Sequence, residues 1–195
     1  AHVVAGVPAE PVLRWAALLH DTGKIATFTQ DATGRGHFYG HAREGTRIAD
    51  SVLRRLKAPT ALREAVVPLI DRHMTRLLPD RKALRRQAAK FGFPFLYALL
   101  ALQEADMGSK GTGEDDGSTL FAETDALLHQ LEAEHSCLSL HDLAVNGNDL
   151  MTLGYSGRAI GTCLNALLGE VLEERLPNEK RSLLAFAAER KEKTL

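Results

Sequence analysis

The sequence has 195 residues, of which 45% are hydrophobic and 25% are charged, with a formal net charge of -1 at pH 7. This length suits one domain, or one domain with a helical addition, and the composition is ordinary for a globular protein with a sizeable core. The near-zero net charge excludes a global basic field of the kind that gives tight, salt-dependent nucleic-acid binding.

The compartment is predicted from what the sequence lacks. No run approaches the roughly 18 apolar residues of a membrane span, and no signal-peptide pattern opens the chain, so we expect a cytoplasmic protein without a membrane partner. Cys137 and Cys163 are too few and too far apart for a disulfide framework, and we expect both to be buried thiols. The opening "AHVVAGVPAEP" lacks a methionine and resembles the end of an amphipathic helix, so we expect either that the full protein continues upstream or that the chain was cut there.

Helical periodicity runs through the sequence, and alternating strand patterns are missing, which predicts an all-α fold. We expect helices at residues 9–21, 40–57, 60–74, 80–91, 94–107, 119–135, 147–153, 157–175 and 178–192. Thr60 is expected to cap its helix, and Pro94 is expected to lie in the first turn of its own.

Two segments between the predicted helices are expected to be loops. The first, 26–40, is long and rich in Gly and Thr, and it leads into a histidine. The second, 108–118, contains no apolar residue and is typical of a mobile linker. It predicts a division into a ligand-binding helical domain, 1–107, and a smaller C-terminal helical domain, 119–195.

Four predicted helices carry ionisable residues near one end of an apolar face. The first ends at His20 with Asp21 beside it, and the other three carry His41, His73 and Asp106. Because steps of three and four residues keep side chains on one helix face, we expect these groups to point into a common core. Imidazoles mixed with carboxylates suit divalent metals such as Mn, Fe, Ni, Co or Zn better than calcium.

Each of these residues alone also has a structural interpretation. A histidine on an apolar face is often a hydrogen-bonded core residue, and Asp106 could cap its helix or pair with an arginine. A second His-Asp pair, His141-Asp142, lacks both the leading helix and the following Gly-Lys, and we interpret it as structural. The recurrence of the pattern on four helices favours a shared metal site.

Several motifs together resemble a known family. "LLHDTGK" resembles the signature of the HD superfamily of metal-dependent phosphohydrolases. With "GHFYGHAREGTRIADSVLRRLKAP" and "VVPLIDRHM" it resembles the HD domain of bacterial tRNA nucleotidyltransferases and poly(A) polymerases. "LAVNGNDLMTLGYSGRAIGTCLNALLGEVLEERLPNE" resembles the helical C-terminal segment of the same proteins, so the resemblance covers nearly the whole chain.

The resemblance implies an all-α HD-domain helical bundle with a smaller C-terminal helical subdomain. It implies one metal held by His20, Asp21 and Asp106, and a second held by His41 and His73, with Asp21 bridging the two. A further histidine ligand of the family would fall just before residue 1. The implied cofactors are divalent ions, Mn, Ni, Fe, Co or Mg, which would activate a shared hydroxide.

The resemblance also implies roles for residues around this metal pair. Asp21 and Lys24 would be catalytic, with Lys24 meeting a phosphate oxygen as a point charge. Arg72 and Tyr39 would complete the substrate site by contacting a phosphate and stacking on a base. Structural alternatives are a solvated lysine at a helix end, a surface arginine, and a core or hinge tyrosine.

Two further segments have both a functional and a structural interpretation. The run "RKALRRQAAK", 81–90, could follow an RNA backbone or form a solvated helix face. In "GYSGRAIG", Arg158 and the helix start could take a phosphate, or the glycines could simply form a cap and a tight turn.

Three functions fit these observations. The first is a metal-dependent phosphohydrolase acting on phosphomonoesters or 2',3'-cyclic phosphodiesters of nucleotides and RNA 3' ends. The alternative is a non-catalytic RNA-binding body of a truncated or split tRNA nucleotidyltransferase, with tRNA as its partner. The third is a regulatory nucleotide-binding domain. The Gly-Ser strand motif and paired aspartates of a nucleotidyltransferase head are not among these residues, so we expect no nucleotide addition by them alone.

Overall fold

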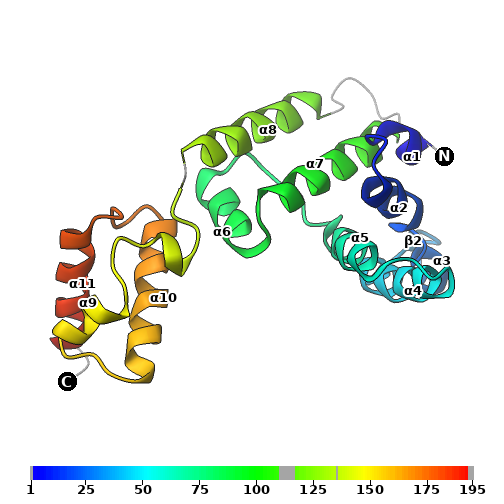
Figure 1. Ribbon diagram of the computed structural model, residues 1–195. Coiled ribbons are helices and arrows are strands. Elements are labelled where there is room, and N and C mark those ends of the chain that lie inside the picture. Colours follow the sequence, from blue (N-terminus) through cyan, green and yellow to red (C-terminus); the bar gives the residue numbers. More distant parts are fainter. Residues whose placement is uncertain (1, 110–116, 135, 193–195) are drawn as a thin grey trace. The chain divides into compact units, whose positions relative to one another are not determined.

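The computed structural model describes residues 2–109, 117–134 and 136–192, and its chain divides into two compact units (Figure 1). The N-terminal unit contains residues 1–79 and 93–125, and the C-terminal unit contains residues 80–92 and 126–195. This division differs from the one expected at 108–118, because the helix at 81–91 groups with the C-terminal unit. Residues 110–116 of the expected linker lie outside the described residues.

The N-terminal unit is mainly helical. Its helices are α1 (His2–Gly6), α2 (Pro11–Leu19), α3 (Lys24–Thr27), α4 (His41–Arg55), α5 (Thr60–Arg72) and α7 (Phe93–Gly108), and the boundary between units falls within α8 (Ser118–Ala133). Helix α5 packs against α2, α4 and α7, while α1 packs against α7.

The cap prediction for Thr60 was wrong by one residue, since Pro59 precedes the helix and Thr60 begins it. Pro94 lies in the first turn of α7, as expected.

The segment 26–40 contains a short hairpin that the sequence pattern did not predict. Strand β1 (Thr29–Gln30) pairs antiparallel with β2 (Gly36–His37). Two-residue strands are too short to produce a periodic hydrophobic signal, which explains why the segment was expected to be a loop throughout. The hairpin precedes His41, the first residue of α4.

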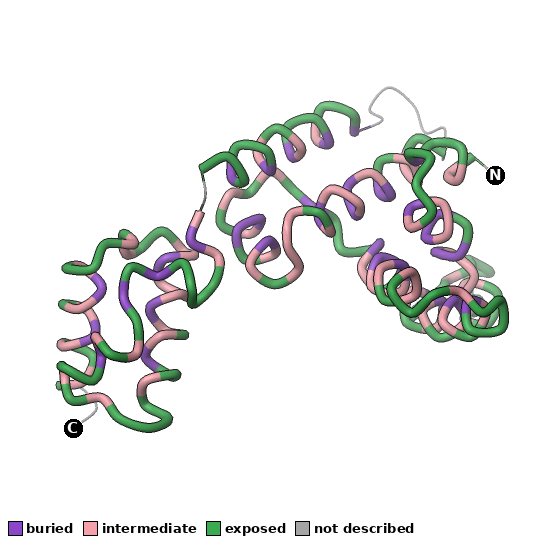
Figure 2. Tube along the Cα trace, in the orientation of Figure 1, coloured by how far each residue is buried: buried purple, intermediate pink, exposed green. Residues whose placement is uncertain are grey.

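The buried faces of the helices form the core of the N-terminal unit (Figure 2). Helix α4 buries His41, Gly45, Ala49 and Leu53, at regular steps of four. Ile48 and Val52, which steps of three and four residues would also place near this face, are only half-buried. The fully buried large side chains contributed by the other helices are Val66, Leu69, Ile70, Leu96 and Leu102.

The C-terminal unit has its own apolar core. Its elements are α6 (Arg81–Phe91), the remainder of α8, a 3₁₀ turn (Leu140–Asp142), α9 (Gly147–Thr152), α10 (Arg158–Leu172) and α11 (Lys180–Glu192). Its core cluster consists of Cys137, Leu143, Val145, Leu150, Cys163, Leu167, Val171, Leu183 and Ala187. Both cysteines are therefore buried and free, as expected.

The helical content of both units confirms the all-α prediction. Within the described part of the chain, no helix combines the length and apolar character needed to cross a membrane.

Candidate metal centre

Three histidines in the N-terminal unit share one hydrogen-bond arrangement. The Nδ1 atom of each donates to a backbone carbonyl three residues earlier, at 2.9 Å for His20 to Ala17, 2.8 Å for His41 to Phe38 and 2.7 Å for His73 to Ile70. Because a carbonyl only accepts, the neutral form of each ring carries its proton on Nδ1 and leaves Nε2 as a lone pair. This is how histidine ligands of metals are usually oriented.

The free Nε2 atoms of His41 and His73 face each other. They lie 3.2 Å apart, and both rings are more than nine-tenths buried. Two neutral rings in this arrangement would direct lone pair against lone pair, which is unfavourable unless a proton or a cation lies between them. Asp21 supplies the nearest anion, with Oδ1 3.6 Å from Nε2 of His41 and 3.9 Å from Nε2 of His73.

His20 lies on the other side of Asp21. Its Nε2 is 3.3 Å from Oδ2 of Asp21 and 3.5 Å from Oδ1 of Asp106. Neither contact has hydrogen-bond geometry, so this buried Nε2 has no hydrogen-bond partner among the described residues. The structure thus brings together all five residues that the sequence predicted as metal ligands.

The electrostatics of the cluster are those of a site that attracts a cation. Burial alone would lower the pKa of His20, but the carboxylates of Asp106 and Asp21 outweigh it and raise that pKa to about 9. Burial opposes ionisation of Asp21, yet His20 and Lys24 hold its pKa well below the usual range. Burial lowers the pKa of His73, and the positive charges of His20 and His41 lower it further. The carboxylates around His20 therefore favour a positive charge at this position.

The geometry fits two adjoining metal positions. One set of ligand atoms comes from Asp21, His41 and His73, and a second comes from His20, Asp21 and Asp106. Within each set the atoms lie within 4.8 Å of one another, and Asp21 belongs to both. Nitrogen and carboxylate ligands in this mixture suit Mn, Fe, Ni or Co.

Gly23 allows this assembly. A Cβ atom at Gly23 would overlap the backbone oxygen of His41 and the backbone nitrogen of Gly45. The turn after the His-Asp pair can therefore lie directly against the start of α4, which brings Asp21 to His41. The role of Gly23 in this close packing was not predicted from the sequence.

A cavity of about 320 Å³ opens above the cluster. It is lined by Asp21, Lys24, Gly36, His37, Phe38, Tyr39, His41, His73, Met74 and Asp106. Lys24 and Tyr39, both predicted to contact a ligand, therefore line the same cavity as four of the five predicted metal ligands. Arg72 does not line it, and its guanidinium lies 3.3 Å from the carboxylate of Asp71.

The second His-Asp pair is built differently. Asp142 accepts hydrogen bonds at Oδ2 from the amide and the hydroxyl of Ser139, both at 2.8 Å, and from the amide of Leu138 at 3.1 Å. These bonds form a reciprocal cap on the 3₁₀ turn. His141-Asp142 is structural, as the sequence predicted.

The arginines of α6 are occupied by carboxylates of the C-terminal unit. Arg81 donates to Glu134 and Glu174, and Arg85 donates to Glu174 at 3.0 Å. Arg86 pairs with Glu173. These ion pairs join α6 to the residues around it, so the three side chains do not form a freely solvated helix face.

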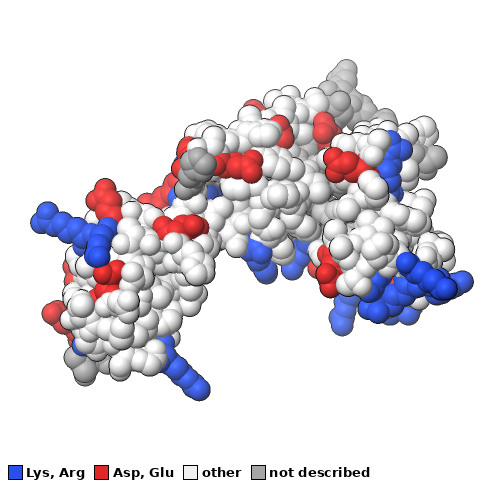
Figure 3. All heavy atoms as spheres, viewed as in Figure 1, with Lys and Arg blue, Asp and Glu red and all other residues white. Residues whose placement is uncertain are grey.

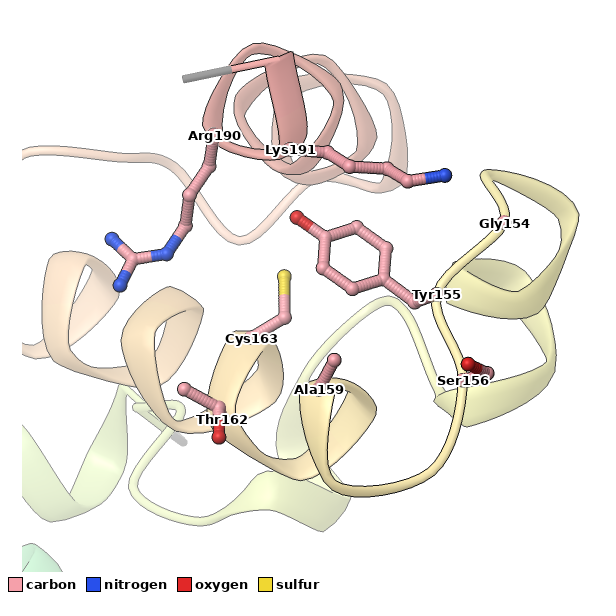
Figure 4. A pocket seen from close by; sticks show the side chains of 8 residues that line it. All are labelled: Gly154, Tyr155, Ser156, Ala159, Thr162, Cys163, Arg190 and Lys191. Atoms are coloured by element: carbon pink, nitrogen blue, oxygen red, sulfur yellow. The ribbon is translucent and has the colours of Figure 1, made fainter. Parts of the chain in front are cut away.

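A second cavity, of about 410 Å³, lies in the C-terminal unit at the "GYSG" segment (Figure 4). The hydroxyl of Tyr155 donates to the carbonyl of Ala187 at 2.8 Å, and Lys191 donates to the carbonyl of Leu153 at 2.7 Å. Gly154 and Gly157 adopt positive φ angles of 80° and 52°, which favour glycine. These contacts are those of a tight turn before α10.

Comparison with known proteins assigns the chain to a family. Residues 43–187 match the family model described as tRNA nucleotidyltransferase domain 2. The chain belongs to this tRNA nucleotidyltransferase family. The matched range includes His73 and Asp106 and begins after His41.

Three curated relatives cover most of the chain. It is 34% identical to an A-adding tRNA nucleotidyltransferase of Deinococcus radiodurans, over 93% of the chain and 43% of the relative. It is 33% identical to a CC-adding tRNA nucleotidyltransferase of Thermus thermophilus, over 89% of the chain and 39% of the relative. It is 28% identical to a multifunctional CCA protein of Legionella pneumophila, over 88% of the chain and 40% of the relative. The chain thus spans less than half the length of these relatives, and no solved structure matches it closely.

These relatives overturn one prediction. The chain was expected to be a metal-dependent phosphohydrolase with Asp21 and Lys24 as catalytic residues, and that prediction of enzyme class was wrong, because the relatives are nucleotidyltransferases. The physical reason is that a cluster of histidines and carboxylates determines what can be bound, whereas it does not determine which reaction follows.

Proposed function

We propose that this chain is the helical body region of a tRNA nucleotidyltransferase, which holds tRNA for a nucleotidyltransferase head. The observation that carries this proposal is the similarity to A-adding and CC-adding tRNA nucleotidyltransferases over about nine-tenths of the chain. It is the non-catalytic alternative that the sequence already indicated.

The charge distribution supports an RNA contact on the N-terminal unit. Lys and Arg side chains gather over α3 and α4 (Figure 3), where the exposed arginines are Arg43, Arg47, Arg54 and Arg55. Arg47 and Arg54 pair with Glu44 and Asp50 of the same helix. The structure gives Arg43 and Arg55 no ion pair within the described residues, which leaves their charge available to phosphate groups.

Salt-dependent binding tests this proposal. The full chain is titrated with labelled tRNA at potassium chloride concentrations from 50 to about 200 mM, and a DNA duplex of equal length is the control. We expect measurable affinity for tRNA that falls steeply with salt, because phosphate contacts release counterions, and weaker binding of the duplex. Absence of tRNA binding at the lowest salt, or equal binding of the duplex, would contradict the proposal.

We further propose that the N-terminal unit is a divalent-metal module of the HD type, with ligands His20, Asp21, His41, His73 and Asp106. The facing Nε2 atoms of His41 and His73 are the main support, since both lone pairs would be available to hold a cation and would otherwise repel each other. Mn, Ni, Fe, Co and Mg are the candidates. A metal there would supply a Lewis-acidic position for a phosphate oxygen, and the protein would orient the ligands through the three carbonyls that fix the rings.

Metal content tests this second proposal. Purified protein loaded with Mn²⁺ or Ni²⁺ and freed of excess ion is analysed for bound metal, with the Asp21→Asn variant treated identically. We expect at least one tightly held ion per chain and its loss in the variant. Equal metal content in both proteins would refute this site.

A further inference from the structure

We propose that Gln103 is a positioning residue of the metal centre, which holds His73 in a fixed place relative to Asp106. Gln103 acts through the backbone around His73 and supplies no ligand atom itself. This inference rests on the proposed metal centre, because His73 and Asp106 are ligands only if that centre holds an ion.

Gln103 lies on α7 and is buried, with an exposed fraction of 8%. Its side-chain amide makes three hydrogen bonds to the backbone of residues 73–77. Nε2 donates to the carbonyls of His73 and Thr75 at 3.1 and 2.7 Å, and Oε1 accepts from the amide of Leu77 at 3.2 Å. This orientation of the amide is the one that satisfies all three backbone groups, because the opposite orientation would place donor against donor and acceptor against acceptor.

The three bonds hold the turn that follows α5. The last carbonyls of a helix have no partner within the helix, and His73 is the C-cap of α5. Gln103 accepts this task for the carbonyl of His73 at one end of the turn and binds the amide of the buried Leu77 at the other. The turn therefore cannot move away from α7 without leaving buried polar groups unpaired.

The backbone that Gln103 holds also positions the ring of His73. Nδ1 of His73 donates to the carbonyl of Ile70 at 2.7 Å, so the ring is fixed to the end of α5. Its Nε2 lies 3.2 Å from Nε2 of His41. A displacement of this backbone would therefore move a ligand atom of the metal position that Asp21, His41 and His73 form.

Gln103 lies on the same helix as a ligand of the other metal position. Asp106 follows it by three residues in the sequence "QEAD", so both side chains project from one face of α7. Asp106 belongs to the ligand set that excludes His73. Gln103 thus connects one ligand of each set through a single turn of helix, which fixes the spacing between the two positions.

Gln103→Met tests this role, because methionine is similar in length and flexible enough to fill the same space, but it lacks both donors. We expect Mn²⁺ affinity, measured by calorimetry on the full chain, to fall about 10- to 100-fold, the range for residues that orient metal ligands. Thr124→Val is the matched control, since Thr124 is buried on α8 and donates to the carbonyl of Leu120 at 2.8 Å. This control removes a buried hydrogen bond from a helix without a ligand and should leave Mn²⁺ affinity unchanged.

A spectroscopic measurement separates positioning from stability. In the metal-free protein, the imidazole nitrogen resonances of His73 should shift in Gln103→Met, because the backbone that carries this ring has lost its contact with α7. The resonances of His20 should shift less, since its ring is fixed to Ala17 of α2.

The wild-type chain supplies a test that needs no folded variant. Coupling between two interactions is reciprocal, so if the hydrogen bonds of Gln103 favour the bound ion, the ion must strengthen these hydrogen bonds. Zn²⁺ is diamagnetic and suits imidazole ligands, which allows the measurement by NMR. We expect the side-chain amide protons of Gln103 to exchange with solvent more slowly once Zn²⁺ is bound, and unchanged exchange would contradict the inference.

The outcomes separate this inference from the proposal on which it rests. If the wild-type chain binds Mn²⁺ and Gln103→Met binds it equally well, the metal centre stands and the positioning role is refuted. Equal weakening in Thr124→Val would also refute this role, because the effect would then follow from stability alone. If the wild-type chain does not bind Mn²⁺, the metal centre is refuted, and the inference with it.

Discussion

The two His-Asp pairs of this chain share a dipeptide and differ in almost everything around it. His20-Asp21 follows a buried helix, and its carboxylate lies within 4 Å of three imidazoles and an ammonium group. His141-Asp142 lies in a 3₁₀ turn, where the carboxylate accepts from two backbone amides and a hydroxyl. The first pair is placed among other ionisable groups, and the second completes a local turn.

The difference shows what makes such a dipeptide a candidate ligand. Hydrogen bonds from Ser139 and the Leu138 amide stabilise the carboxylate of Asp142 and hold its pKa below the ordinary range. These bonds occupy the carboxylate without a cation. Around Asp21, hydrogen bonds to backbone carbonyls fix the histidine rings but leave their Nε2 atoms turned inward. Unsatisfied convergent lone pairs, rather than the dipeptide itself, indicate a metal site.

The largest expected effect comes from removing the charge of the shared aspartate. Asp21→Asn keeps the shape but weakens the anionic ligand of both metal positions, so Mn²⁺ affinity should fall by more than about 100-fold, beyond the usual effect of altering an outer-shell partner. Asp142→Asn is the matched control and should leave Mn²⁺ affinity unchanged. Calorimetric titration with Mn²⁺ measures the affinity of both variants. An equal loss of affinity in the two variants would contradict the proposed difference between the two His-Asp pairs.

A smaller effect is expected from glycines in the two units. Gly23→Ala forces a Cβ into the start of α4 and should lower the free energy of unfolding by about 1–3 kcal/mol. Gly169→Ala, in α10, meets no atom within 4 Å and should raise it by about 0.5–1 kcal/mol, because alanine favours helix. Chemical denaturation measures the change in the free energy of unfolding for both variants, which should have opposite signs. An unchanged free energy for Gly23→Ala would contradict the close approach of the turn to α4.

The smallest expected effect is a pH dependence of the hairpin. The hydrogen bond from His37, followed by those from Thr33, lowers the pKa of Asp31 to about 2. Because this pKa lies below the ordinary value of about 3.9, the stabilisation is present above about pH 4 and is lost as pH falls through about 2. Ring resonances of His37 and Tyr39, followed by NMR, should shift together in that interval. Resonances that move only at higher pH would show that Asp31 does not hold the hairpin.

The helices and the convergence of the five ionisable residues could be predicted from sequence because both depend on periodicity. The ionisable residues ended apolar stripes on four predicted helices, so packing those stripes together was enough to bring His20, His41, His73 and Asp106 near one another. On α4, His41 is the first buried residue and lies at one end of the buried face, as predicted.

The remaining features depend on contacts that periodicity does not encode. The hairpin has two-residue strands and is fixed by the side chain of Asp31, whose only sequence signal was an Asp-Ala-Thr-Gly turn. The partners of Arg81 and Arg85 come from residues 134 and 174, which no local pattern connects to α6. The prediction of the enzyme class was wrong for a different reason, because a short motif indicates a type of site and does not determine the reaction.

Diffraction from crystals of the full chain grown with Mn²⁺ tests the central claim most directly. Anomalous scattering locates the ion without reference to any activity. The account predicts a peak between the Nε2 atoms of His41 and His73 and beside Asp21, with a second position available toward His20 and Asp106. A map without a peak in this cluster, from crystals in which Mn²⁺ is present at saturating concentration, would contradict it.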